Sequence, residues 1–138
     1  MALLNYTTEV PVARTVQEIM DRLQAYGVQA LMVEYDGARQ PVGLAFRINT
    51  AHGVLPFQLP VNIGRVAKLL TVQYQKGQVP RAAVRAGQPE RTAWRILKQW
   101  VDAQLALIQI DMVTLDQVFL PYTNMGQGKT LYDVLANE

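Results

Sequence analysis

The segment Val42–Thr50, with the sequence VGLAFRINT, decides the fold. Its even positions from Val42 to Ile48 are apolar, whereas its odd positions are small or polar. Because successive side chains of a strand point to opposite faces, this alternation predicts a β-strand with one buried face and one wet face. A second strand, Val28–Tyr35, is apolar on both faces, which predicts a central position in the sheet. A third, Val54–Pro60, contains Pro56 and Pro60, which cannot donate to a ladder and therefore predict an edge strand.

A strand and a helix are predicted before these segments. Residues 2–12 are extended in character and stop at Pro11, so we expect a first strand there. Thr15 and Glu18 then form the Thr-x-x-Glu pattern of a capping box. Apolar residues follow at helical spacing, so the pattern predicts a helix over about residues 16–26.

Three helical segments are predicted after the strands. Asn62 is a good N-cap for a helix over about residues 63–76. Pro89 suits the first turn of a third helix, which runs to about Ile110, and Thr114 caps a short fourth segment. The order is β-α-β-β-β-α-α. It predicts an α+β fold, with a mainly antiparallel sheet of three to four strands and two or three helices packed on one face.

The length and composition predict a single domain over residues 1–138. Half of the residues are hydrophobic and 17% are charged, as in globular chains. Within the domain we expect a mobile basic loop at residues 77–88 and a C-terminal tail with a short helix at residues 122–138. There is no cysteine, which excludes disulfides and thiolate sites and fits a reducing compartment. No signal peptide and no apolar run of the ~18 residues needed for a membrane span is visible, so we expect a cytoplasmic protein without a membrane partner.

Basic residues gather in one segment, residues 65–98. It holds eight of the thirteen Lys and Arg residues and one acid, Glu90, so its net charge is +7 in a chain of net charge +2. The eight residues are Arg65, Lys68, Lys76, Arg81, Arg85, Arg91, Arg95 and Lys98. Such clustering predicts a surface that binds an anion, since cations that neutralise phosphates release condensed counterions. The ordinary alternative is a solvated helix face next to a basic loop.

The spacing of the charged residues brings several of them to common helix faces. The third helix carries four at i, i+4, i+7 and i+11, namely Arg91, Arg95, Lys98 and Asp102. Arg65 and Lys68 share a face of the second helix. If the two helices pack side by side, these faces form a continuous track together with Arg81 and Arg85 on the intervening loop.

Aromatic residues extend this prediction. Tyr35, Tyr74 and Tyr122 are candidates to stack on nucleic-acid bases. Trp94 and Trp100 lie among the apolar residues of the third helix, and we expect them in the core or at a subunit interface.

No motif for catalysis or metal binding emerges. Gly126–Thr130 resembles the end of a P-loop, but Thr123 stands where a glycine is needed and no buried strand precedes it, so we expect a loop with Thr130 as a helix N-cap. His52 is the one histidine, in a predicted turn, and cannot form a typical zinc site without cysteines. Glu34 lies in a largely apolar strand, and we expect it to be paired with an arginine or exposed at a strand end. Whether Glu34 or His52 has a chemical role stays open, and we predict a protein without enzyme activity, metal or cofactor.

Four short segments carry a resemblance. They are NYTT at residues 5–8, AWRI at 93–96, VFLPY at 118–122 and GKTLY at 128–132. With them, the chain resembles a family of small proteins encoded in bacteriophage and prophage genomes, and the resemblance covers nearly the whole chain. It implies the cytoplasm of a bacterial host cell during infection and supplies no catalytic residues.

Three functions follow from the charge, and the residues alone do not identify the anionic partner. The first is a non-enzymatic phage accessory protein that binds nucleic acid, as an oligomeric single-strand binder. The second is an anti-defence protein that sequesters an anionic or cyclic nucleotide signal in a pocket lined by the arginines, often at a subunit interface. The third is an inhibitor that docks on an acidic host protein through the broad apolar surface of the third helix. We expect a homo-oligomer.

Overall fold

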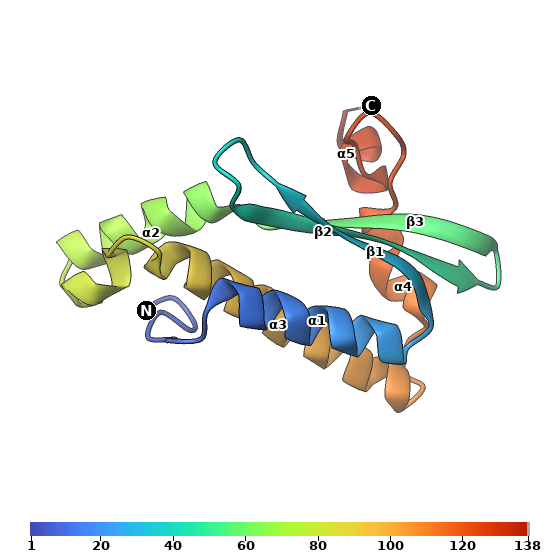
Figure 1. The fold of residues 1–138 in the computed structure, drawn as a ribbon, viewed down its shortest axis with the longest axis horizontal. Helices are drawn as coiled ribbons and strands as arrows, with labels where there is room; N and C mark the ends of the chain where they lie inside the picture. The colour runs from blue at the N-terminus through green and yellow to red at the C-terminus, as the bar shows by residue number, and fades with distance from the viewer. Residues whose placement is uncertain (138) are drawn as a thin grey trace. The chain divides into compact units, whose positions relative to one another are not determined.

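The computed structural model describes residues 1–137 and has an α+β fold with five α-helices and one three-stranded antiparallel sheet. Two compact units make up the chain, and we call them unit 1 and unit 2. Unit 1 comprises Met1–Ile19 and Val61–Val101, and unit 2 comprises Met20–Pro60 and Asp102–Glu138. Figure 1 labels the helices α1 (Val12–Ala25) and α3 (Gln88–Gln109). Each of these helices contributes residues to both units.

The sheet of unit 2 has the order β1-β2-β3, with β1 at Val28–Tyr35, β2 at Pro41–Thr50 and β3 at Gly53–Pro60. The predicted strands and the edge position of β3 are confirmed. The central position predicted for β1 is wrong, since β1 pairs with β2 alone and β2 is the central strand. Met32 and Tyr35 of β1 are exposed, which gives the reason. An apolar composition on both faces of a strand does not require a neighbour on both edges.

The core of unit 2 follows the alternation predicted for β2. Phe46 and Ile48 are buried, and Phe57 of β3 lies beside Phe46 with ring centroids 5.7 Å apart. The helix α4, Leu115–Phe119, packs on this face. Its Phe119 ring meets Phe46 edge to face at 5.3 Å and Phe57 at 5.8 Å. Edge-to-face aromatic pairs are favourable beyond the area that they bury.

The C-terminal segment confirms two predicted helix caps. The Thr114 hydroxyl caps α4, and the short 3₁₀ helix η2, Leu120–Tyr122, follows it. Thr130 caps α5, Leu131–Ala136. A β-bridge between Asn124 and Thr130 closes the glycine-containing loop that resembles a P-loop. The helix that follows this loop has six residues, so the long helix that a P-loop opens is not present in the described chain.

Unit 1 is built around α2, Ile63–Gln75, and the 3₁₀ helix η1, Arg81–Val84. The predicted cap of α2 is confirmed, because Asn62 Oδ1 accepts a hydrogen bond from the backbone of Arg65 at 3.0 Å. The turn after α2 brings η1 back against it, and three buried residues form the resulting core cluster: Leu70, Val79 and Ala83. Residues 77–88 therefore contain a short packed helix that the sequence pattern does not indicate.

The strand predicted over residues 2–12 is wrong. Residues 4–7 form a turn, in which Thr8 N donates to Asn5 O at 3.1 Å. Side-chain amides satisfy the backbone here in place of a neighbouring strand. Leu3 N donates to Gln73 Oε1 at 3.0 Å, and Gln73 Nε2 donates to Met1 O at 2.9 Å.

The capping box predicted at Thr15 is also wrong. Helix α1 begins at Val12, about four residues earlier than predicted, and the backbone amides of Arg14 and Thr15 donate to Pro11 O. Thr15 is fully buried and accepts a hydrogen bond from Arg95 of α3. Thr15 and Glu18 match the capping-box pattern, but the helix extends further toward the N-terminus and begins directly after Pro11.

None of the helices within residues 1–137 is long and apolar enough to cross a membrane.

Candidate anion-binding site

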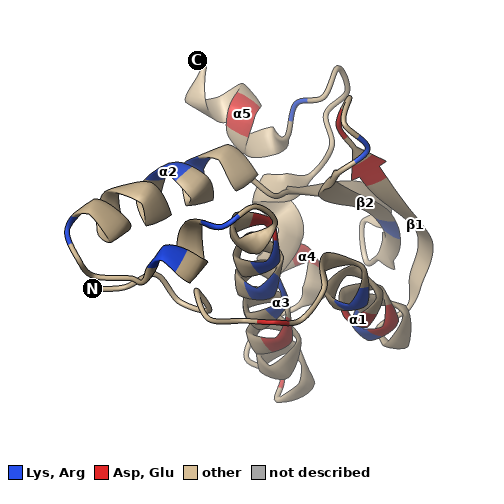
Figure 2. Ribbon diagram, turned by 60° about the vertical axis from the view of Figure 1, so that its left-hand side comes forward, with Lys and Arg blue, Asp and Glu red and all other residues tan. Residues whose placement is uncertain are grey.

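The positive charge of the chain is concentrated in unit 1. This unit carries nine basic and three acidic residues, a net charge of +6, whereas unit 2 carries four basic and eight acidic residues, a net charge of −4. All eight predicted site residues belong to unit 1. They lie on or next to α2, η1 and the first half of α3, and Figure 2 draws Lys and Arg in blue. The asymmetry seen in the sequence is thus a property of one compact unit.

Two of the eight basic residues form ion pairs with one carboxylate of the same unit. Glu18 Oε2 of α1 lies 3.0 Å from Nη1 of Arg95 and 3.8 Å from Nζ of Lys98. The Lys98 residue is 8% exposed, which leaves little of it for a partner in solution. Arg91, Arg95 and Lys98 align on one face of α3. The part of this face that carries Arg95 and Lys98 is therefore not available as a continuous binding surface. It supplies ion pairs between α1 and α3.

The charge of Glu18 is held firmly by its surroundings. Partial burial by itself raises the pKa of this carboxyl group. The hydrogen bond from Arg95 and the positive charges of Arg95, Lys98 and Arg14 outweigh that effect, so the pKa of Glu18 lies below its ordinary value of 4.5. Glu18 is consequently ionised at neutral pH and neutralises part of the basic segment.

Five basic side chains remain exposed, and none has a side-chain hydrogen bond or ion pair to any residue within 1–137. They are Arg65, Lys68, Lys76, Arg81 and Arg85. Arg65, Lys68 and Lys76 lie on one face of α2 and its C-terminal end, at spacings of three and eleven residues. Arg81 begins η1 and Arg85 follows its end. These five residues, which we call the basic surface, are the predicted contacts that are available to a partner.

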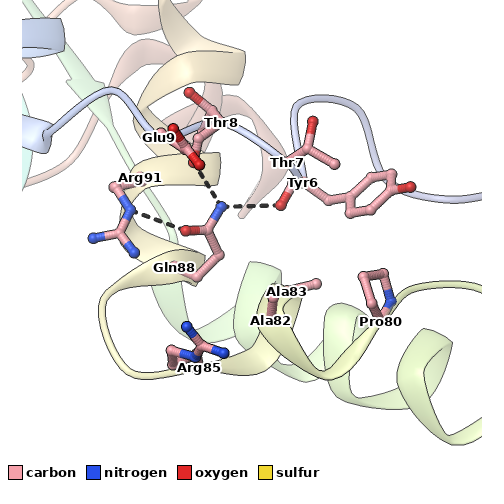
Figure 3. A pocket seen from close by; sticks show the side chains of 10 residues that line it. All are labelled: Tyr6, Thr7, Thr8, Glu9, Pro80, Ala82, Ala83, Arg85, Gln88 and Arg91. Atoms are coloured by element: carbon pink, nitrogen blue, oxygen red, sulfur yellow. Dashed lines mark hydrogen bonds between the residues drawn. The ribbon is translucent and has the colours of Figure 1, made fainter.

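An open pocket of about 400 Å³ lies between the N-terminal turn and the corner that joins η1 to α3, all within unit 1 (Figure 3). Apolar groups of Tyr6, Pro80, Ala82 and Ala83 line part of it. Its polar lining consists of Thr7, Thr8, Glu9, Arg85, Gln88 and Arg91. Two of the predicted cations thus meet at a hollow instead of a flat surface.

Gln88 holds the two walls of this pocket together. Its Nε2 donates to the carbonyl oxygens of Tyr6 at 2.9 Å and of Thr8 at 2.8 Å, and its Oε1 accepts from Arg91 Nε at 2.9 Å (Figure 3). The residue is 8% exposed, and both amide hydrogens and the amide oxygen are bonded. The sequence pattern does not indicate this role of Gln88. A glutamine before Pro89 carries no local signal that its partners stand 80 and 82 positions away.

The Arg91 guanidinium is fixed by two neighbours. Its Nε donates a hydrogen bond to Gln88 Oε1. The guanidinium lies over Gly87, so that a Cβ at Gly87 would stand 3.2 Å from Nη1. Gly87 has φ +87°, a conformation that side-chain-bearing residues rarely adopt. No described residue bonds to Nη1 or Nη2 of Arg91, so both can donate to a ligand.

His52 and Glu34 each contact one polar side chain of unit 2. His52 Nε2 lies 3.4 Å from Asp116 Oδ2 at the start of α4, and Glu34 accepts from Gln58 Nε2 at 3.2 Å. The pKa of Asp116 is lowered, first by the hydrogen bond from the Thr114 hydroxyl, against the opposing effect of burial. No group of three or more His, Asp or Glu side chains within residues 1–137 is placed to hold a metal ion.

The aromatic residues divide between surface and core. Tyr74 of α2 is exposed in unit 1, whereas the exposed Tyr35 and the half-buried Tyr122 belong to unit 2. Trp94 is fully buried, and Trp100 is half-buried. Tyr74 is therefore the one of the three predicted stacking residues that shares a unit with the basic surface.

Comparison with protein-family models, with curated proteins and with solved structures found no match. The function is therefore inferred from the residues and their arrangement.

Proposed function

We propose that unit 1 is a non-enzymatic nucleic-acid-binding module whose basic surface contacts the phosphate backbone. The observation that carries this proposal is the set of five exposed basic side chains without a partner among residues 1–137. Like charges gathered on one unit repel one another, and a polyanion relieves that repulsion while it releases condensed counterions. Three of the five are arginines, whose planar guanidinium matches phosphate oxygens in a bidentate manner.

The single strand is the preferred form of the nucleic acid in this proposal. Tyr74 is exposed near the C-terminal end of α2, in the same unit as the basic surface. Bases of a single strand stack on exposed aromatic rings while the phosphates follow neighbouring cations. A duplex offers no unstacked base to Tyr74, so the proposal favours the single strand.

The test is fluorescence anisotropy of fluorescein-labelled single-stranded and duplex DNA, titrated with protein across a salt series. We expect log K to fall linearly with log salt, and tighter binding of the single strand. Lys68→Gln with Arg81→Gln should reduce the slope by about 2, since each phosphate contact contributes about 1. The matched control is Arg39→Gln with Arg47→Gln, which removes the same charge from exposed positions of unit 2. No binding at low salt, or equal losses in both double variants, would overturn the proposal.

A second candidate function is docking on an acidic protein surface, and one observation favours it. Leu69 and Val72 are 43% and 38% exposed, and they lie on the same face of α2 as Arg65 and Lys76. Exposed apolar residues framed by cations suit a partner that is both apolar and acidic.

The two candidates respond differently to the apolar positions. Leu69→Ser with Val72→Ser should leave phosphate-backbone binding within twofold of wild type. The probe for the second candidate is a synthetic amphipathic helix with glutamates beside leucines. Its binding should be lost in the same double variant and in Arg65→Gln. A peptide that does not bind at low salt would exclude this candidate.

A further inference from the structure

We infer that the pocket of Figure 3 binds a phosphate monoester, and that Arg85 and Arg91 contact its phosphate group. This inference rests on the proposed binding of phosphates by unit 1 and names the group that the pocket receives. The chemistry is that of a terminal phosphate, which is carried both by the end of a nucleic-acid strand and by a free nucleotide. The basic surface recognises the internal phosphates of a strand, whereas the pocket would recognise its end.

The pocket is a built site. Gln88 is more than nine-tenths buried and bonds to both walls, to the carbonyls of Tyr6 and Thr8 on one side and to Arg91 on the other. A hydrogen-bonded buried amide fixes the geometry of the groups around it. The arrangement of the walls is thus set before a ligand arrives, which lowers the entropy lost on binding.

Arg91 is the pre-organised phosphate-binding residue of this site. Its Nε is occupied by Gln88, and its guanidinium lies in the space that Gly87 leaves free. The remaining nitrogens, Nη1 and Nη2, form the fork that binds two oxygens of a phosphate. An arginine held in one orientation loses less freedom on binding than a lysine or a free arginine.

Arg85 supplies the second positive charge and joins the pocket to the basic surface. It lines this pocket and also a second hollow that it shares with Arg81 and Val84. In the view of Figure 3, the guanidinium group of Arg91 lies on the opposite side of Gln88 from Tyr6 and Pro80, and that of Arg85 lies below Gln88. A strand that follows Arg81 and Arg85 therefore reaches the pocket with its end.

The charge of the pocket favours a phosphate monoester, which is a dianion, over a phosphate diester, which is a monoanion. The lining of the pocket contains two guanidinium groups and one carboxylate, that of Glu9, which is exposed. A monoester carries close to two negative charges at neutral pH, since the second pKa of a phosphate is about 6. A diester carries one negative charge and needs room for the chain on both sides. Thr8 Oγ1 accepts from Val10 N at 3.3 Å, which leaves its hydrogen free to donate to a phosphate oxygen.

Glu9 opposes the ligand and gives the inference a test of unusual sign. Its carboxylate lines the pocket and repels a phosphate. Glu9→Gln should therefore tighten the binding of a terminal phosphate, whereas most changes at a binding site weaken it. Glu9 is exposed, so this variant is expected to fold normally.

The experiment compares one oligonucleotide sequence with a 5′-phosphate, with a 3′-phosphate and with hydroxyl ends, each carrying an internal fluorescein, by anisotropy. We expect one phosphorylated end to bind about tenfold more tightly than the hydroxyl form, as for one or two charge-assisted hydrogen bonds. Arg91→Lys keeps the charge but loses the fork, and should reduce this ratio to about one. Glu9→Gln should raise it. Lys76→Gln, on the basic surface, should weaken all three oligonucleotides by the same factor.

A second arm uses AMP, with adenosine as the control, in isothermal titration calorimetry. Binding of AMP but not of adenosine, lost in Arg91→Lys, assigns the pocket to a free nucleotide as well as to a strand end. If all oligonucleotides bind equally and AMP does not bind, the inference is wrong while the proposed function stands. If no oligonucleotide binds but AMP does, the proposed function is wrong while the phosphate pocket stands. Thermal unfolding of Arg91→Lys and Glu9→Gln checks that both variants are folded.

Discussion

The carboxylate of Glu18 in α1 lies 3.0 Å from the guanidinium of Arg95 in α3. The same Oε2 oxygen lies 3.8 Å from Nζ of Lys98. One acid therefore neutralises two of the eight cations that the sequence groups together, and it does so between two helices. This pairing separates the structural cations from those of the basic surface.

Glu18→Gln should destabilise the protein by about 1–2 kcal/mol at pH 7, because two partly covered cations lose a charged acceptor. The pKa of Glu18 is lowered in the folded protein, so its contribution to stability is complete above the ordinary value of 4.5. It is lost as the pH falls through the folded-state pKa. Urea unfolding at pH 7 and at pH 3 measures this, and the difference between wild type and variant should shrink at pH 3.

The control for Glu18 is Glu9→Gln, which removes an exposed carboxylate of the same unit. Its effect on the free energy of unfolding should stay within about 0.5 kcal/mol at both pH values. Equal effects of the two substitutions would mean that net charge, and not the contact with Arg95 and Lys98, is responsible.

Gln88→Ala should destabilise unit 1 by about 2–3 kcal/mol, because three hydrogen bonds are lost and the carbonyls of Tyr6 and Thr8 lose their donors. The N-terminal turn should then become accessible, and limited proteolysis before Pro11 measures this. Gln78→Ala, at an exposed position of the same unit, is the control and should behave like wild type.

Gln88→Glu separates the two roles of this residue. A glutamate still accepts from Arg91 but cannot donate to the carbonyls of Tyr6 and Thr8. Proteolysis of the N-terminal segment should therefore increase as in Gln88→Ala. Protection equal to that of wild type would show that the amide donors do not hold the turn.

Local patterns predict the elements whose causes are local. The alternation in Val42–Thr50 identifies the central strand, since burial of one face imposes a period of two. Asn62, Thr114 and Thr130 mark helix starts, because a cap bonds to amides two or three residues away. The capping pattern at Thr15 fails, because the preceding residues also accept a helical conformation and packing against α3 extends the helix.

Long-range contacts explain what the sequence does not reveal. The N-terminal residues look extended, but side-chain amides of Gln73 and Gln88 bind their backbone, and no local pattern reports these partners. The charge of the candidate site is visible in the sequence as a count. Which cations are paired depends on the position of Glu18 on a different helix. The corner between η1 and α3 places Arg85 and Arg91 in the lining of one pocket.

Phe119→Ala should destabilise the protein by about 3–5 kcal/mol, as for other buried aromatic truncations. Phe119 is fully buried and touches the rings of Phe46 and Phe57, so the variant leaves a cavity against the sheet. Urea unfolding at neutral pH measures the loss. The neighbouring Leu120 is 49% exposed, and Leu120→Ala should cost less than about 1 kcal/mol. Similar losses for both would place α4 away from the sheet.

Gly87→Ala tests the support of Arg91. Gly87 and Gly77 have φ values of +87° and +73°, so an alanine at either position is disfavoured by about 1 kcal/mol. A Cβ at Gly77 meets nothing within 4 Å, whereas a Cβ at Gly87 stands 3.2 Å from Nη1 of Arg91. Both variants should lose similar stability in urea unfolding. Only Gly87→Ala should shift the guanidinium and lower the preference for a phosphorylated strand end, by several-fold. If the two alanine variants keep the same preference, the position of Arg91 over Gly87 does not matter for phosphate binding, and Arg85 would have to supply the selectivity alone.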